Sequence, residues 1–300
     1  MAAPTPITIL HLSDTHLFGD DSRHYGVVDT EAALVRSLGQ FSGIAELDLL
    51  VLSGDLSDDG SPRSYEKLRS IVEPWAAQRR ARVIYAMGNH DLRTSFRKVL
   101  GNGHGADAGQ DAADPGSAPT GPVDGVSTSG PWRIVTIDSS VPGAGYGELD
   151  DVQLNRLAEV LATPAEAGTV LVIHHPPAPA FTALLQALEL YNPEDLLEVV
   201  RGSDVRVILS GHYHHPLRQT FAGIPVIVTP GIANAADLLA PEGTERATIG
   251  SGATLVTVTT DDVRSSVLRA YGPEDGRQLF HLDRETVAQF VREAGRVDTR

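Results

Sequence analysis

The chain has 300 residues, of which 41% are hydrophobic and 21% charged, so it is able to bury a core of ordinary globular size. Its formal net charge is -15 and its basic residues form no stripe, which argues against a nucleic-acid-binding surface. The absence of cysteine excludes disulfides and thiolate metal sites, and without a secretory leader or a long apolar run the sequence predicts a cytoplasmic protein with no membrane span.

Short apolar runs and helical patterns alternate over the first two thirds of the chain. Helices are predicted at Asp29–Phe41, with Asp29 or Thr30 as N-cap, and at Ser61–Arg79, where Ser61 is able to cap and Pro62 suits the first turn. Two further helices are predicted at Asp150–Leu161 and Pro193–Arg201. The apolar runs are typical of strands covered on both faces; they are Ile7–Ser13, Leu47–Ser53, Arg82–Met87, Ile134–Asp138, Thr169–Ile173 and Val205–Ser210.

The remaining segments differ in character. The Gly-, Ala-, Pro- and Asp-rich stretch 101–130 predicts a mobile surface insertion. Meandering strands are predicted at Leu217–Phe221, Ile224–Thr229, Ala253–Thr259 and Val263–Ala270. Two packed sheets with outer helices then form one domain over residues 1–270. A C-terminal extension, 271–300, carries a weak amphipathic helix that uses Val287, Phe290 and Val291 and is expected to pack on the same domain.

Five polar corners follow apolar runs directly. Because ligands bind beyond the carboxyl ends of strands in α/β sheets, these corners are expected to meet at one rim if the strands are parallel neighbours. Their candidate residues are Asp14 and His16 in SDTH, Asp55 in SGDLSDDG, Asn89, His90 and Asp91 in MGNHD, His174 and His175 in VIHHPP, and His212 and His214 in LSGHYH.

Carboxylate, amide and imidazole together suit Mn, Fe, Zn or Co better than Ca. On an extended segment, side chains two apart point the same way, so Asp14 and His16 would hold one ion, and so would His212 and His214 if their corner stays extended. The alternative is that each pair straddles two ions. Structural or solvated roles are predicted for the other histidines, with His11 inside the first strand. Asp58 and Asp59 are interpreted as loop or orienting groups; the remaining histidines are His24, His104, His215 and His281.

The ordered set Asp-x-His, Gly-Asp, Gly-Asn-His-Asp, His-His-Pro and Gly-His-x-His resembles the calcineurin-like metallophosphoesterase superfamily over about residues 7–229. The segments LHLSDTHL, GDLSDDGSPRSYEKLR, MGNHDLR and HHPPAP are similar to the class III (mycobacterial-type) 3',5'-cyclic nucleotide phosphodiesterases. The resemblance implies a four-layer α/β/β/α sandwich with a dinuclear site between two mixed sheets. Asp58 stands where purple acid phosphatases carry tyrosine, so a tyrosinate–iron centre is not expected.

The same resemblance implies roles for individual residues. His90 would face the phosphate, with Asn89 also binding substrate, and Asp91 would orient His90. His174 is preferred over His175 because the family's ligand stands two residues before a proline, here Pro176. One metal ion would be held by Asp14, His16, Asp55 and His214, and the other by Asp55, Asn89, His174 and His212.

The implied activity is hydrolysis of 3',5'-cyclic nucleotides, foremost cyclic AMP, to nucleoside 5'-monophosphates by two Mn, Fe or Zn ions. The implied partners are a small anionic phosphodiester and a second copy in a homodimer. The metal ligands do not separate this activity from 2',3'-cyclic nucleotide, glycerophosphodiester or phosphomonoester hydrolysis. A binding protein on an inactive hydrolase fold would show broken ligand corners, and a nuclease would show a basic groove; the sequence has neither.

Overall fold

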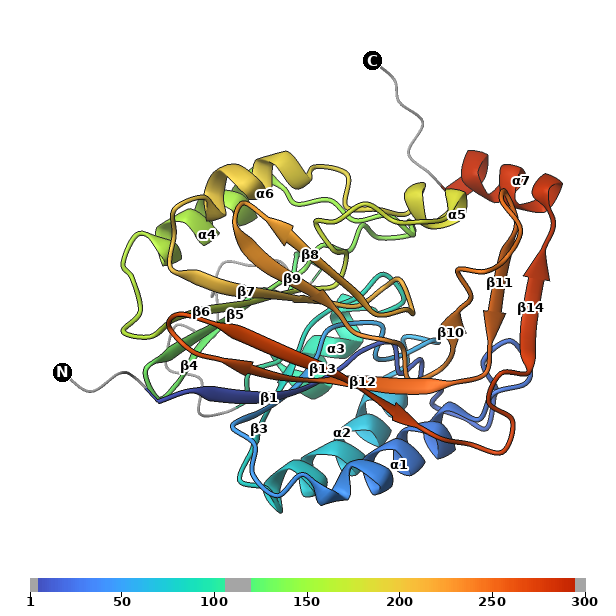
Figure 1. The fold of residues 1–300 in the computed structure, drawn as a ribbon, viewed down its shortest axis with the longest axis horizontal. Helices are drawn as coiled ribbons and strands as arrows, with labels where there is room; N and C mark the ends of the chain where they lie inside the picture. Colours follow the sequence, from blue (N-terminus) through green and yellow to red (C-terminus); the bar gives the residue numbers. More distant parts are fainter. Residues whose placement is uncertain (1–4, 106–119, 295–300) are drawn as a thin grey trace.

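Two large β-sheets stack face to face between two layers of helices in the computed structural model, which describes residues 5–105 and 120–294 (Figure 1). The first sheet has the strand order β13-β12-β1-β2-β3. Its strands are β1 (Ile7–Leu12), β2 (Leu49–Leu52), β3 (Arg82–Tyr85), β12 (Ser251–Val258) and β13 (Val263–Ala270). Strands β1, β2 and β3 are parallel, and β12 and β13 extend the sheet antiparallel.

The second sheet has the order β4-β5-β6-β7-β9-β8. Four of its strands, β5, β6, β7 and β9, are parallel, and β4 and β8 pair antiparallel at the two edges. The strands are β4 (Gly125–Ser129), β5 (Trp132–Ile137), β6 (Gly168–Ile173), β7 (Val205–Ser210), β8 (Leu217–Phe221) and β9 (Ile224–Val228). Each of the six apolar runs of the first two thirds therefore forms a strand in one of the two sheets.

Apolar side chains fill the space between the sheets. Ile9 and Val51 of the first sheet and Val172 and Leu209 of the second belong to one core cluster, and all four are fully buried. Burying apolar surface stabilises a fold by roughly 25 cal/mol per Å². The layer between the sheets and the two helix–sheet layers hold the buried apolar side chains, so they supply the main stabilisation. The near-continuous apolar runs in the sequence reflect strands that are covered on both faces.

Helices cover the outer faces of both sheets. The first sheet packs against α1 (Thr30–Gln40), α2 (Pro62–Ala77) and α3 (Arg93–Leu100), and the second against α4 (Asp151–Leu161) and α6 (Pro193–Val200) (Figure 1). Asp29 caps α1 by accepting from Ala32 N at 2.9 Å, and Ser61 caps α2 by accepting from Ser64 N at 3.2 Å. The four-layer α/β/β/α sandwich is confirmed, as are the four predicted helices.

A small third sheet and two more helices lie at one end of the sandwich, beside each other in Figure 1. The sheet has the order β10-β11-β14. Its elements and neighbours are β10 (Ala235–Ala236), β11 (Glu245–Thr248), β14 (Gln278–Leu282), α5 (Ala183–Gln186) and α7 (Arg284–Ala294). Because β14 pairs with β11 and α7 contacts α5, the predicted extension packs on the rest of the chain, with Val287 buried.

Both ends of the segment 101–130, which was predicted as a mobile surface insertion, pack on the sandwich. Strand β4 lies inside it and pairs with β5, and His104 is buried with its ring bonded to Ser127 and Thr136. That contact confirms a structural role for His104. Residues 106–119 lie outside the described part of the chain, as do 295–300 of the predicted C-terminal helix. Across the described residues, none of the helices has the length and apolarity needed to cross a membrane.

Candidate metal centre

The five polar corners meet where the parallel strands end. Ligand atoms of four residues, Asp14, His16, Asp55 and His214, lie within 4.8 Å of one another. His16 Nε2 is 3.3 Å from His214 Nε2 and 3.7 Å from the Asp55 carboxylate, and His214 Nε2 is 3.2 Å from the Asp14 carboxylate. Residues 198 positions apart in the chain thus share one acidic, imidazole-lined corner.

Left-handed backbone conformations aim these side chains. Asp14, His16, Asp55, His212 and His214 have φ angles between 45° and 71°, and they are five of the eight described non-glycine residues with positive φ. Such strain clusters at functional sites. The expectation that Asp14 and His16 lie on an extended segment is therefore wrong: the first corner pairs with the second, where Asp14 N donates to Gly54 O and His16 N donates to Asp55 O, both at 3.0 Å.

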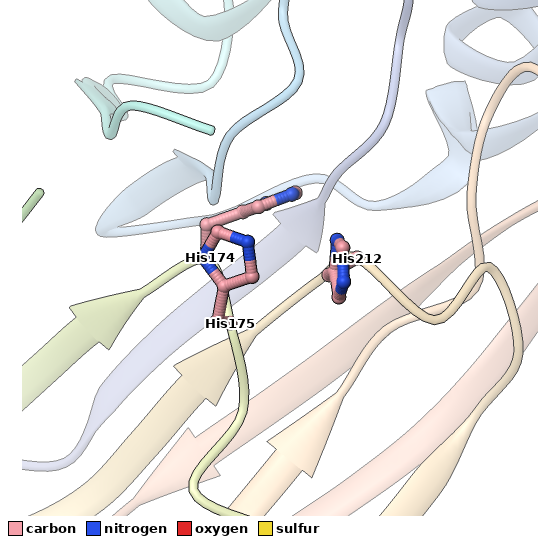
Figure 2. A group of neighbouring side chains, drawn as sticks. All are labelled: His174, His175 and His212. Carbon is pink, nitrogen blue, oxygen red and sulfur yellow. The ribbon is translucent and has the colours of Figure 1, made fainter. Parts of the chain in front are cut away.

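A second histidine group adjoins the first. His174 and His175 follow β6, and His212 follows β7; their ligand atoms lie within 4.8 Å of one another (Figure 2). His174 Nε2 is 3.4 Å from the Asp55 carboxylate, so Asp55 stands between His16 of the first group and His174 of the second. The Oδ1 atom of Asn89, in the adjacent corner, is buried without a hydrogen-bond partner.

Hydrogen bonds from the histidine rings determine which ring nitrogen is available to bind a metal ion. His16 Nδ1 lies 2.9 Å from the Asp58 carboxylate, His174 Nδ1 is 2.8 Å from Ser53 O, and His212 Nε2 is 2.9 Å from Leu188 O. In each case the bonded nitrogen is engaged by the protein and the other is the one available to a metal ion, the arrangement typical of metal-ligating histidines. His174 Nε2 is indeed buried without a hydrogen-bond partner among the described residues.

His175 differs from His174 in this respect. Its Nδ1 is 2.8 Å from Ser139 Oγ and its Nε2 is 3.2 Å from Gly145 O, so both ring nitrogens have partners. Because Gly145 O accepts the Nε2 proton, Ser139 donates to Nδ1. This geometry favours His174 over His175 as the ligand of the pair.

Burial and the two carboxylates set the protonation of the site. Burial lowers the pKa of His16 to about 4 and that of His212 to about 3, so both are neutral at pH 7, as ligands must be. Burial also opposes charge on His174, yet the neighbouring Asp55 raises its pKa to about 9. Conversely, burial would raise the pKa of Asp55, but His174 and the other imidazoles hold it well below the usual range.

The Asn-His-Asp corner divides into two roles. The side chain of His90 is 44% exposed and lies against the His16 ring, with Nδ1 3.6 Å from Asp58. Asp91 is buried and holds backbone: it accepts hydrogen bonds from Leu56 N, Ser57 N and Gly88 N at 2.9–3.2 Å, and from Tyr65 OH at 3.0 Å. The expectation that Asp91 orients His90 is therefore corrected, since the carboxylate beside His90 belongs to Asp58.

Two other histidines lie beside the centre, and the local sequence indicates their roles only weakly. His24 was expected to be structural, but its ring lies 4.6 Å from that of His16, and it bonds Asp58 at 3.2 Å and Asn234 at 3.0 Å. Nothing in the local sequence distinguishes His24. His11 is buried with Nε2 2.8 Å from Ser53 Oγ, as expected of a core histidine.

A calcineurin-like phosphoesterase family model matches residues 7–216 of the chain. The protein belongs to this family. A "cAMP/cGMP dual specificity phosphodiesterase" of Mycobacterium tuberculosis is 43% identical over 270 residues, covering 89% of this chain and 80% of that protein. A "probable cyclic nucleotide phosphodiesterase" of Rhodococcus erythropolis is 43% identical over 262 residues, covering 87% and 82%.

Solved structures share the fold at low sequence identity. A dimetal phosphatase from Danio rerio superposes with a TM-score of 0.55 at 15% identity, covering 88% of this chain and 99% of that one. Calcineurin-like phosphoesterases use a dinuclear metal centre, and the donor set here fits such a centre. Two of its buried donor atoms, Asn89 Oδ1 and His174 Nε2, lack a hydrogen-bond partner among the described residues, and the carboxylate–amide–imidazole chemistry matches first-row transition metals.

Proposed function

We propose that this calcineurin-like phosphoesterase is a metal-dependent phosphodiesterase that hydrolyses 3',5'-cyclic nucleotides, foremost cyclic AMP, to nucleoside 5'-monophosphates. The observation that carries the proposal is the position of Asp55 between two histidine groups, with His16 on one side at 3.7 Å and His174 on the other at 3.4 Å. The substrate class follows the names of the two relatives that are 43% identical.

The ligand sets proposed for the two ions share Asp55. Mn, Fe or Zn suits the donors, and the unpartnered His174 Nε2 and Asn89 Oδ1 are among the atoms that would bind. A bound pair of divalent ions supplies Lewis-acid stabilisation of phosphoryl charge and a nucleophile at neutral pH. One ion is assigned to Asp14, His16, Asp55 and His214, and the other to Asp55, Asn89, His174 and His212.

His90 is proposed to contact the substrate directly. It is the most exposed imidazole of the cluster, and its Nδ1 faces the Asp58 carboxylate, whose pKa is held well below its usual range by hydrogen bonds from His16 and His24 despite burial. A Nδ1–H directed at Asp58 orients the ring and leaves Nε2 for the substrate. When the ring carries a proton on both nitrogens, the Nε2–H of His90 either donates to a phosphoryl oxygen or protonates the leaving alkoxide. Asp91 acts as a positioning residue because it touches only backbone and Tyr65.

The decisive experiment compares substrates. Purified protein with added Mn²⁺ is assayed against cyclic AMP, cyclic GMP, 2',3'-cyclic AMP and bis-p-nitrophenyl phosphate. Preferred hydrolysis of the 3',5'-cyclic compounds is expected. Activity confined to phosphomonoesters would contradict the proposal.

A further inference from the structure

The pocket above the candidate metal centre has two unlike walls. It is a cavity of about 150 Å³ whose polar wall is built from His16, Asp55, His90, His212 and His214. The opposite wall comes from α5 and the third sheet, which Figure 1 places together at one end of the sandwich. Leu184, Leu185 and Leu188, which are half-buried, form its apolar part. A ligand with an anionic end and a flat, largely apolar end would match both walls.

Two aromatic rings, tilted by 50° to each other, line this pocket: Phe280 of the third sheet and Tyr25. Glu245 and Ala247 lie two residues apart on β11 and are both buried on its pocket side. Ala247 pairs with Phe280 of β14, and the Phe280 ring lies 4.8 Å from the ring of Tyr25. Tyr25 and Phe280 also line the pocket. Paired aromatic rings of this kind stack readily on planar ligands.

Glu245 supplies one carboxylate oxygen that has no hydrogen-bond partner among the described residues. Its side chain is 4% exposed, and its carboxylate accepts a hydrogen bond from Thr182, whose hydroxyl also caps α5 at Leu185 N. Its Oε2 atom is buried without a hydrogen-bond partner among the described residues. An unsatisfied buried carboxylate oxygen is costly, and because Glu245 lines the pocket, its unpaired oxygen points to a ligand that donates to it.

We infer that this wall is a nucleobase subsite, in which the base lies against Tyr25 and Phe280 and its exocyclic amino group donates to Glu245 Oε2. The inference rests on the proposed function, because the same pocket places the phosphate beside His90. Adenine, guanine and cytosine carry such an amino group, whereas uracil presents carbonyl oxygens there and would leave Glu245 unpaired.

The test removes the acceptor while keeping the bulk of the side chain. In the metal-loaded protein, Glu245→Leu is expected to lower kcat/KM for cyclic AMP about 10- to 100-fold relative to kcat/KM for bis-p-nitrophenyl phosphate, which has no base. Its preference for cyclic AMP over cyclic UMP should shrink by a similar factor. Glu242→Leu is the matched control, because Glu242 is exposed on the preceding turn and lines no part of this pocket.

Other outcomes overturn the inference. An equal loss on both substrates would give Glu245 a structural role, and an unchanged cyclic AMP to cyclic UMP ratio would remove it from base recognition. Should Glu245→Leu fail to fold, Tyr25→Ala tests the same wall, since Tyr25 is 60% exposed and its truncation should raise KM for cyclic AMP selectively. Failure of the proposed function is separate: wild-type protein would then cleave bis-p-nitrophenyl phosphate but neither cyclic nucleotide.

Discussion

Replacing Asp91 with alanine should destabilise the fold rather than remove a catalytic group. The carboxylate accepts three backbone N–H bonds and the Tyr65 hydroxyl, all at 2.9–3.2 Å and all in a buried corner. Each buried donor left unpaired costs about 1–3 kcal/mol, so the three amides alone imply a loss of at least about 3 kcal/mol. That is a large share of the typical 5–15 kcal/mol of net stability and corresponds to roughly 6–12 °C in Tm.

Urea unfolding measures the loss, and Tyr65→Phe serves as the graded comparison. The phenylalanine removes one of the four donors to Asp91 and unpairs Leu92 N, which donates to Tyr65 OH at 2.9 Å, so about 1–2 kcal/mol is expected. The reasoning is refuted if the free energy of unfolding of Asp91→Ala lies within about 1 kcal/mol of the wild-type value. A lowered kcat at unchanged Tm would instead restore Asp91 as the residue that orients His90.

Four further predictions concern the centre itself. Asn89→Ala should lose most turnover while near-ultraviolet circular dichroism stays native, and full activity would remove Asn89 from the site. His90→Ala should depress kcat by about 10² or more, whereas an effect on KM alone would demote His90 to binding. Gly54→Ala should destabilise by about 2–6 kcal/mol in thermal unfolding, because φ is +109° and an added Cβ would lie 2.4 Å from the His174 ring; a stable variant would show that the ring moves freely. Removing metal with a chelator should abolish hydrolysis and lower Tm, with both restored by Mn²⁺, and persistent activity would argue against the metal centre.

The strands and capped helices were predictable because their signals are local. A nearly continuous apolar run such as Val205–Ser210 indicates a strand that is buried on both faces. Asp29 and Ser61 are residue types that cap helices with their side chains, so they can be recognised in the sequence. Helix α3 was missed because its N-cap, Leu92, makes no side-chain capping bond. Strand β4 was missed because its composition resembles a loop, and Gly125 stands where an added Cβ would meet the His104 ring at 2.3 Å.

The sequence predicts which residues meet at the candidate site, but it does not predict the backbone conformation that aims their side chains. Each ligand-type corner directly follows a strand, so topology alone brings the corners together. The left-handed backbone at His16 depends on its amide pairing with Asp55 O, a contact between distant segments. The burial of Glu245 likewise arises only when β11 pairs with β14, and two strands of four and five residues leave little trace in sequence.

The five left-handed residues at the corners also bear on how such a chain tolerates change. Each non-glycine residue held in that conformation costs roughly 1–2 kcal/mol, so together they approach the net stability of a small domain. Glycine at any of these corners would relieve that cost and would simultaneously remove a side chain that is proposed to hold a metal ion. A relative that is no longer selected for hydrolysis would therefore gain thermal stability by substituting these residues with glycine. A higher Tm in a relative with glycine at these corners would indicate that it has lost hydrolytic activity.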